Sequence, residues 1–156
     1  MSRAAKPITT YLELTDPAAI RPARPVTAAI ARVDPPDGAV NRSFYEAVGR
    51  DYRWTDQLGR DDAWWQAHAE AVETWVLMGD AGYYELHRVG GDVEIAYFGL
   101  LPAYHGRGLG GALLEHALRR GFMLGARVWV HTCTFDGPHA LANYRARGLV
   151  PYRVER

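Results

Sequence analysis

Apolar and polar residues alternate along several short segments of the chain, which is the pattern of a β-strand with one buried face. Ile8–Leu14 is the first such segment, and Val26–Val33 is predicted to be a second strand that pairs with it. A turn rich in proline follows at residues 34–38. Glycine turns join three later strands into an antiparallel meander. The remaining strands are predicted at Thr74–Met78, Tyr83–Val89, Val93–Leu101, Arg127–Cys133 and Val150–Glu155.

Other segments repeat apolar residues at the spacing of an amphipathic helix. Asn41–Gly49 is predicted to be the first helix, with Asn41 or Ser43 as its N-cap. The later helices are predicted at Asp61–Glu73, Gly110–Leu124 and Pro138–Arg147. Strands, helices, a meander and a final strand–helix–strand–helix–strand order predict an α+β fold with one right-handed crossover between two parallel strands.

The length and composition suit one domain that covers residues 1–156, of which residues 1–7 are predicted to be flexible. Eighteen basic residues balance eighteen acidic ones, so net charge gives no reason to expect nucleic acid or an anionic membrane as a partner. No apolar run approaches the roughly 20 residues of a membrane span. The first residues lack the apolar core of a signal peptide, and a cytoplasmic location is therefore expected.

Few residues suggest redox, metal or serine chemistry. The single cysteine, Cys133, excludes an internal disulfide and is expected to be a buried strand residue. The chain has no HxExH, CxxC or paired-histidine helix, so no metal is expected. It also has no Gly-x-Ser-x-Gly motif, which argues against a serine hydrolase.

The loop His105–Gly111 is the most informative segment. Its glycines allow a tight turn in which main-chain N–H groups face an anion without interference from Cβ atoms. The predicted helix that begins there adds the positive end of its dipole, and Arg107 adds a charge. The loop is therefore predicted to bind a pyrophosphate.

Two classes of cofactor use such a loop. Residues 106–111 match the Gly-x-Gly-x-x-Gly pattern of dinucleotide-binding proteins. Four residues separate the preceding strand from the first glycine, however, whereas a dinucleotide-binding turn follows its strand directly. The strand Arg127–Cys133 does not end in an acidic residue that would bind a ribose, and the unit comes late in the chain, after a meander.

The second class fits better. Residues 105–110, His-Gly-Arg-Gly-Leu-Gly, resemble the Gln/Arg-x-x-Gly-x-Gly/Ala motif with which members of the GNAT superfamily bind acetyl-CoA. The Leu-Leu-Pro sequence before the loop and residues 140–149, which look like the Asn-x-Tyr-type helix of that superfamily, extend the resemblance from about Val93 to the C-terminus.

The resemblance implies a GNAT acyl-CoA N-acyltransferase fold, in which helices flank a mixed, mostly antiparallel sheet with one splayed parallel strand pair. It also implies acetyl-CoA as co-substrate, held by His105, Gly106, Arg107, Gly108, Leu109, Gly110 and Gly111. Two features differ from the family pattern. His105 replaces the usual Gln or Arg, and the chain ends where a typical member has one more strand, whose place the N-terminal strand or a partner chain would take.

Transfer of an acetyl group to an amine needs help with proton transfer and with the charge on the carbonyl oxygen. By resemblance, main-chain N–H groups of Gly99, Leu100 and Leu101 bind the pantetheine arm and polarise the carbonyl, with Gly99 suited to a bulge or a close backbone approach. Tyr144 is the predicted general acid, although a core tyrosine is the alternative. Asn143 is predicted to bond pantetheine or to face solvent.

Glu94 is the candidate base by resemblance, because its Glu-Ile-x-Tyr/Phe pattern on the central strand resembles the position of a catalytic glutamate in some members of the superfamily. Strand alternation puts it on one face with Ala96, Phe98 and Leu100. An exposed glutamate at a strand edge is the alternative. His131 is the reserve base, although a histidine satisfied within the core is the favoured interpretation. A chain of ordered waters would make a dedicated base unnecessary.

The first two helices and their connection are expected to select the acceptor amine, which would be a small molecule or a peptide. Tyr45 and Trp54 are candidate lining residues, Asp56 is a candidate partner for an ammonium group, and Trp64 or Trp65 is assigned to the core. A homodimer is a further expectation, since this fold often dimerises. The competing functions are a dinucleotide-binding oxidoreductase and a non-catalytic acyl-CoA sensor.

Overall fold

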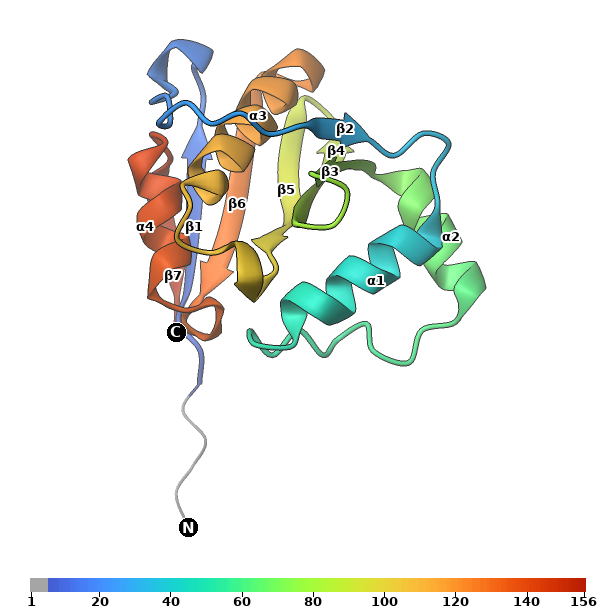
Figure 1. Ribbon diagram of the computed structural model, residues 1–156. Helices are drawn as coiled ribbons and strands as arrows, with labels where there is room; N and C mark the ends of the chain where they lie inside the picture. Colours follow the sequence, from blue (N-terminus) through green and yellow to red (C-terminus); the bar gives the residue numbers. More distant parts are fainter. Residues whose placement is uncertain (1–5) are drawn as a thin grey trace.

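A computed structural model describes residues 6–156 and confirms the predicted α+β architecture over that range (Figure 1). Of the seven residues predicted to be flexible, residues 1–5 lie outside the described part. The strands are β1 (Thr9–Leu14), β2 (Ile30–Arg32), β3 (Glu73–Leu77), β4 (Gly82–Val89), β5 (Asp92–Leu100), β6 (Arg127–Cys133) and β7 (Val150–Glu155). The α-helices are α1 (Gly38–Gly49), α2 (Asp62–Ala71), α3 (Leu109–Leu124) and α4 (Pro138–Ala146).

Within residues 6–156 the strands form one seven-stranded sheet in the order β2-β3-β4-β5-β6-β1-β7. Only β5 and β6 run parallel, and α3 connects them as the predicted crossover. The meander β3-β4-β5 is antiparallel, as its short glycine turns require. The sheet is therefore mixed and mostly antiparallel.

The N-terminal strand takes the place of the strand that the resemblance requires near the C-terminus. β1 lies between β6 and β7 and pairs antiparallel with both of them. One face of β1 is apolar, and its residues Leu12 and Leu14 are buried in the core. The N-terminal strand is thus the one of the two expected occupants that fills this place in the described chain.

Two predictions near the N-terminus are wrong. Val26–Val33 was expected to pair with the first strand, but β2 is only three residues long and pairs with β3 at the opposite edge of the sheet. α1 begins before the predicted caps Asn41 and Ser43, because Asp37 caps it by accepting a hydrogen bond from the N–H of Ala39.

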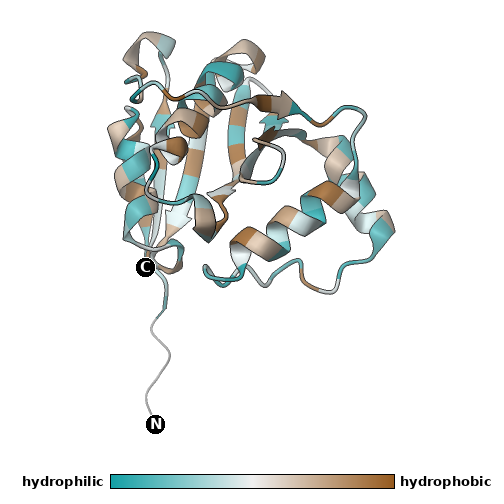
Figure 2. Cartoon of the chain, in the orientation of Figure 1, coloured by the Kyte–Doolittle hydropathy of each residue, from teal (hydrophilic) through white to brown (hydrophobic). Residues whose placement is uncertain are grey.

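The sheet has apolar cover on both faces. Tyr84 of β4 belongs to a core cluster that includes the buried side of α3, whereas its neighbour Tyr83 belongs to a second cluster with Phe44 and Val48 of α1. Successive residues of a strand point to opposite faces, so the two clusters lie on opposite sides of the sheet. Figure 2 shows the mixture of apolar and polar positions along the helices and central strands that this arrangement requires.

Candidate active site

A cleft opens where the two parallel strands separate. β5 and β6 pair only over Asp92–Glu94 and residues 127–129, and from there each strand continues without the other. The cleft has a volume of about 1710 Å³ and runs from the α1–α2 connection, between the strands, to the start of α3 and one side of α4. The sequence-predicted site residues line it, except for Leu101, Arg107 and Gly111.

The loop before α3 presents a row of main-chain donors. Within residues 6–156, no acceptor is found for the N–H groups of Gly106–Gly111. The next N–H along the chain, that of Ala112, does have an acceptor, since it donates to the Gly108 carbonyl at 3.4 Å. The first N–H groups of a helix have no partner within the helix itself. They carry the positive end of the helix dipole, so this row suits an anion.

The glycines of the loop fit this use. Gly106 and Gly108 have φ values of +77° and +75°, which favour glycine. A Cβ atom at Gly110 would lie 3.6 Å from the Asn143 amide nitrogen and 3.7 Å from a methyl of Leu100, and both of these residues line the cleft. The residues present thus fit the pyrophosphate of a coenzyme A thioester.

Three other loop residues are placed less favourably than predicted. The His105 ring lies with Nε2 3.1 Å from the Leu100 carbonyl and therefore bonds the protein itself. Arg107 is exposed, and its guanidinium lies over the Tyr104 ring, 5.5 Å from the centroid. Gly111 faces the N-terminal segment, since a Cβ there would lie 3.3 Å from Ala23.

Two of the three residues predicted at the end of β5 line the cleft, and the third does not. Gly99 and Leu100 line the cleft on the stretch of β5 that no longer pairs with β6. The N–H of Leu101 is not available, because it donates to the Ala81 carbonyl at 2.9 Å. Gly99 allows a close approach, since a Cβ there would lie 2.4 Å from Val48 of α1.

A β-bulge lies at Ala96 and not at Gly99. Glu85 pairs with Tyr97 and Leu86 with Ile95, so Ala96 is the extra residue on β5. The bulge reverses the alternation after Ile95. Phe98 and Leu100 therefore pack with the α3-side core and not on the face of Glu94, which corrects the predicted parity. Glu94 lines the cleft at the last paired position, where the strands begin to diverge.

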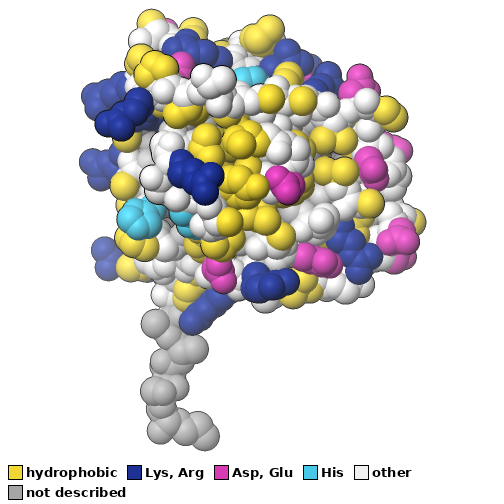
Figure 3. Space-filling model, viewed as in Figure 1, with side chains coloured by type: hydrophobic (Ala, Val, Ile, Leu, Met, Phe, Trp, Pro, Cys, Tyr) yellow, Lys and Arg dark blue, Asp and Glu magenta, His cyan; other side chains and the backbone are white. Residues whose placement is uncertain are grey.

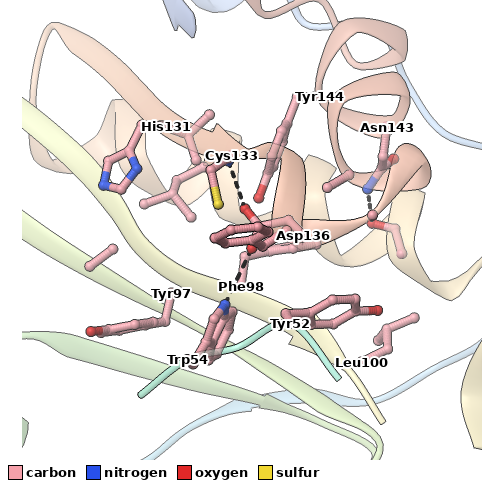
Figure 4. Close-up of a pocket in the computed structure, with 18 of the residues that line it drawn as sticks. Tyr52, Trp54, Tyr97, Phe98, Leu100, His131, Cys133, Asp136, Asn143 and Tyr144 are labelled. Atoms are coloured by element: carbon pink, nitrogen blue, oxygen red, sulfur yellow. Dashed lines mark hydrogen bonds between the residues drawn. The ribbon is translucent and has the colours of Figure 1, made fainter. Parts of the chain in front are cut away.

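Tyr144 projects from α4 into the cleft, where its ring meets Phe98 at 6.1 Å in an edge-on arrangement. Figure 4 shows its hydroxyl directed toward the region of Cys133 and Asp136. Burial raises the pKa of Tyr144, and the nearby charge of Asp136 raises it further. The hydroxyl therefore keeps its proton at neutral pH.

Asn143 and Asp136 hold the walls of the cleft together (Figure 4). Asn143 donates to the Gly110 carbonyl at 3.2 Å and so ties α4 to the first turn of α3. Asp136 accepts hydrogen bonds from the Trp54 indole at 3.3 Å and from the hydroxyl of Thr132 at 2.6 Å. Asp136 was not predicted, because its bond to Trp54, which lies 82 residues away in sequence, depends on the fold.

The end of the cleft beside the α1–α2 connection, which was predicted to select the acceptor, is aromatic. Tyr45 lines it but is almost fully buried, and its hydroxyl accepts from the N–H of Gln57 at 3.0 Å. The rings of Trp54 and Tyr97 contact each other, with 5.2 Å between their centroids. The predicted ammonium partner Asp56 is exposed at the cleft wall. As predicted, Trp65 is buried in the core.

Two β6 residues are more accessible than expected. His131 is exposed and lines the cleft, packed 5.5 Å from Tyr11, so its interpretation as a core histidine is wrong. Cys133 ends β6 as a half-buried free cysteine on the cleft wall, and not as a buried residue. Neither Glu94 nor His131 has a side-chain hydrogen bond to another described residue.

A buried pair on the acceptor side was missed. Glu85 of β4 is 0% exposed, and its carboxylate lies 2.5 Å from Nε2 of His68 on α2, which lines the cleft. Burial lowers the pKa of His68, but the hydrogen bond and charge of Glu85 outweigh this, so the pKa ends above 6.5. Seventeen residues separate the two, so only the fold brings them together.

No three His, Cys, Asp or Glu side chains within residues 6–156 gather as a metal site would require. Over the same residues, no helix combines the length and apolar character needed to cross a membrane.

Comparison with solved structures gives the same fold. A GCN5-related N-acetyltransferase from Kribbella flavida superposes with a TM-score of 0.63 at 20% identity, over 92% of this chain and 54% of that one. A second GCN5-related N-acetyltransferase, from Sphaerobacter thermophilus, superposes with a TM-score of 0.67 at 18% identity, over 95% of this chain and 49% of that one. A GNAT family acetyltransferase from Streptococcus pneumoniae superposes with a TM-score of 0.58 at 23% identity, over 78% of this chain and 86% of that one. This chain thus spans about half the length of the first two.

No protein of curated function matches the sequence. The profile of the acetyltransferase (GNAT) family matches residues 40–149, which is more than half of the chain. This match covers the separated strands, the glycine loop and α4. The chain belongs to the GNAT acetyltransferase family.

Proposed function

We propose that this protein is an N-acetyltransferase that moves the acetyl group of acetyl-CoA to a primary amine of a small molecule or peptide by direct attack. The row of main-chain N–H groups at Gly106–Gly111 carries the proposal. It lies at the start of a helix and opens on a cleft that continues between the separated strands. A pyrophosphate at the loop would direct an attached arm into that cleft.

The residues of the chain have distinct roles in this proposal. Acetyl-CoA supplies an activated acyl group as a thioester. The amides of the loop and the start of α3 bind its diphosphate, and Asn143 fixes the wall beside them. Main-chain groups of Gly99 and Leu100, on the unpaired stretch of β5, orient the arm and the carbonyl. Tyr144, whose hydroxyl is protonated at neutral pH, donates a proton to the departing sulfur.

The distribution of charge agrees with an anionic coenzyme and a cationic acceptor. On the face in Figure 3, Lys and Arg dominate the left side, over α4, whereas Asp and Glu lie mainly on the right, over α1 and α2, together with some arginines. The competing dinucleotide function has less support, because β5 and β6 are the only parallel pair in the described sheet.

Calorimetry combined with product analysis tests the proposal. Acetyl-CoA should bind, NAD should not, and mass spectrometry should detect an acetylated amine in a panel of polyamines, amino acids, arylalkylamines and peptides. At about a hundred times its Kd, acetyl-CoA should stabilise the fold by about 2.7 kcal/mol. Binding without any acetylated product would instead identify an acyl-CoA sensor, and binding of NAD alone would refute both functions.

A further inference from the structure

A buried carboxylate lies behind the acceptor side of the cleft. Glu85 accepts a hydrogen bond from the Asn41 amide at 2.9 Å, and the same amide lies 2.9 Å from the Thr74 hydroxyl. The other polar atoms nearby are not all satisfied, since Asn41 Oδ1 and the Tyr83 hydroxyl are buried without a partner among the described residues. A buried charge of this kind rarely improves stability over an apolar side chain, so a functional reason is favoured.

His68 connects that carboxylate to the cleft. Its Nε2 lies 2.5 Å from Glu85 Oε1, while its ring stacks on Trp64 at 5.2 Å and an interplanar angle of 6°. Trp65 meets the same ring edge-on at 5.9 Å. No described residue bonds to the other ring nitrogen, Nδ1, and 18% of the side chain remains exposed. The ring is thus fixed in position with one nitrogen free.

The position of this ring suits an acceptor amine. His68 contacts Tyr97 at 6.2 Å between centroids, and Tyr97 directly follows the bulge at Ala96, close to the point where β5 and β6 separate. Tyr45 and Trp54 wall the same region with aromatic faces, which attract an ammonium group. An amine bound there would have the fixed imidazole on one side and the separated strands on the other.

We propose that His68 is the residue that takes the proton from the acceptor's ammonium group, with Glu85 as the positioning residue behind it. This inference rests on the proposed function. The N–H bond of the ammonium breaks, its electron pair stays on nitrogen, and the proton moves to Nδ1. The nitrogen then bonds the thioester carbonyl carbon, the C–S bond breaks, and the sulfur takes the proton of Tyr144. Tyr144 regains a proton from the newly acylated nitrogen, so one amide, one free thiol and one proton on His68 result.

The hydrogen bond fixes which ring nitrogen is free. In neutral His68, Nε2–H donates to Glu85, so Nδ1 keeps a lone pair for the incoming proton. The groups that face this ring from the neighbouring elements are Glu85 on β4, Tyr97 on β5 and, across Trp64, Arg60. Glu85 carries the negative charge that raises the pKa of His68 and makes it a stronger base near neutral pH.

A kinetic comparison tests the assignment on the full chain. We expect His68→Gln to lower kcat at neutral pH by about a hundredfold or more for the best amine of the panel, with acetyl-CoA affinity within twofold of the wild type. The deficit should shrink as the pH approaches the pKa of the free amine, because the amine then loses its proton without help. His116→Gln, outside the cleft wall, is the matched control and should keep kcat unchanged.

Four kinetic outcomes would count against the assignment. Equal kcat in wild type and His68→Gln would overturn the role of His68 while leaving the acetyltransferase function intact. A hundredfold loss that is the same at every pH, or one found in Glu94→Gln instead, would also overturn it. Absence of any acetylated amine with the wild type would refute the proposed function itself, and this inference with it.

Nitrogen-15 NMR of the His68 ring gives a second test that needs no turnover. We expect the neutral ring to carry its proton on Nε2, the pKa to lie above 6.5, and the pKa to fall in Glu85→Gln. A proton on Nδ1, or a wild-type pKa at or below 6.5, would contradict the proposal. Because the spectrum also shows whether each variant is folded, loss of activity through unfolding is recognised.

Discussion

The backbone conformation of Gly108 determines the shape of the loop before α3, to which we propose that acetyl-CoA binds. Its φ of +75° is unfavourable for any residue with a Cβ, so Gly108→Ala should cost about 1–2 kcal/mol in unfolding free energy. It should also weaken acetyl-CoA binding, since the loop must shift. Gly90→Ala is the matched control, because Gly90 has φ +61° in the β4–β5 turn, outside the cleft. Calorimetry should show a weaker Kd only for the Gly108 variant, and equal affinities would argue against the loop as the binding site.

The hydroxyl of Tyr144 is the proton donor in the proposed mechanism. Tyr144→Phe should reduce kcat by about a hundredfold or more and leave acetyl-CoA affinity unchanged, because only the proton donor is lost. A raised pKa keeps the hydroxyl protonated, so Tyr144 should add no alkaline decline to the wild-type rate below about pH 10. Tyr152→Phe, on exposed β7, is the control. Steady-state kinetics with unchanged kcat in Tyr144→Phe would remove this residue from the mechanism.

The site residues differ in how well the sequence predicts them. Gly106–Gly111 and the pair Asn143–Tyr144 stand in short local patterns, and these patterns correctly predict cleft residues, apart from Arg107 and Gly111. His68 and Glu85 lie in ordinary helix and strand patterns, and their hydrogen bond depends on how α2 packs on β4. A carboxylate in the middle of the predicted strand Tyr83–Val89 was the one signal that could have indicated them.

At the scale of elements, β1 is essential because it lies between β6 and β7. Leu12→Ala, at a fully buried position of β1, should lower the unfolding free energy by about 2–5 kcal/mol. Leu58→Ala, at a position that is 52% exposed, should change it by less than about 0.5 kcal/mol. Urea unfolding measures both. A small effect of Leu12→Ala would mean that β1 is not a stable part of the sheet.

Element boundaries followed local patterns, whereas pairing did not. β6 and β7 have the predicted bounds, and a glycine lies two residues before each of them, at Gly125 and Gly148. The partner of β2 could not be predicted, since alternation shows a strand but does not show its neighbour. The bulge at Ala96 was equally hidden, because a single inserted residue leaves no compositional trace.

At the scale of the whole molecule, the sheet separates two chemical tasks. The α3–α4 side presents main-chain donors to an anion, and the α1–α2 side presents aromatic rings and a fixed imidazole. The separation of β5 and β6 joins the two sides through one cleft. In the proposed function, side chains of the α1–α2 unit would select the amine, and these side chains share no short motif that the sequence would reveal.

A crystal structure of the protein with acetyl-CoA tests the central claim most directly. We predict that diphosphate oxygens lie within about 3 Å of main-chain nitrogens of Gly106–Gly111, which is the distance of an N–H···O hydrogen bond. The thioester should lie between β5 and β6, near the Tyr144 hydroxyl. A diphosphate bound elsewhere, with these amides bonded to other groups of the protein, would contradict the account.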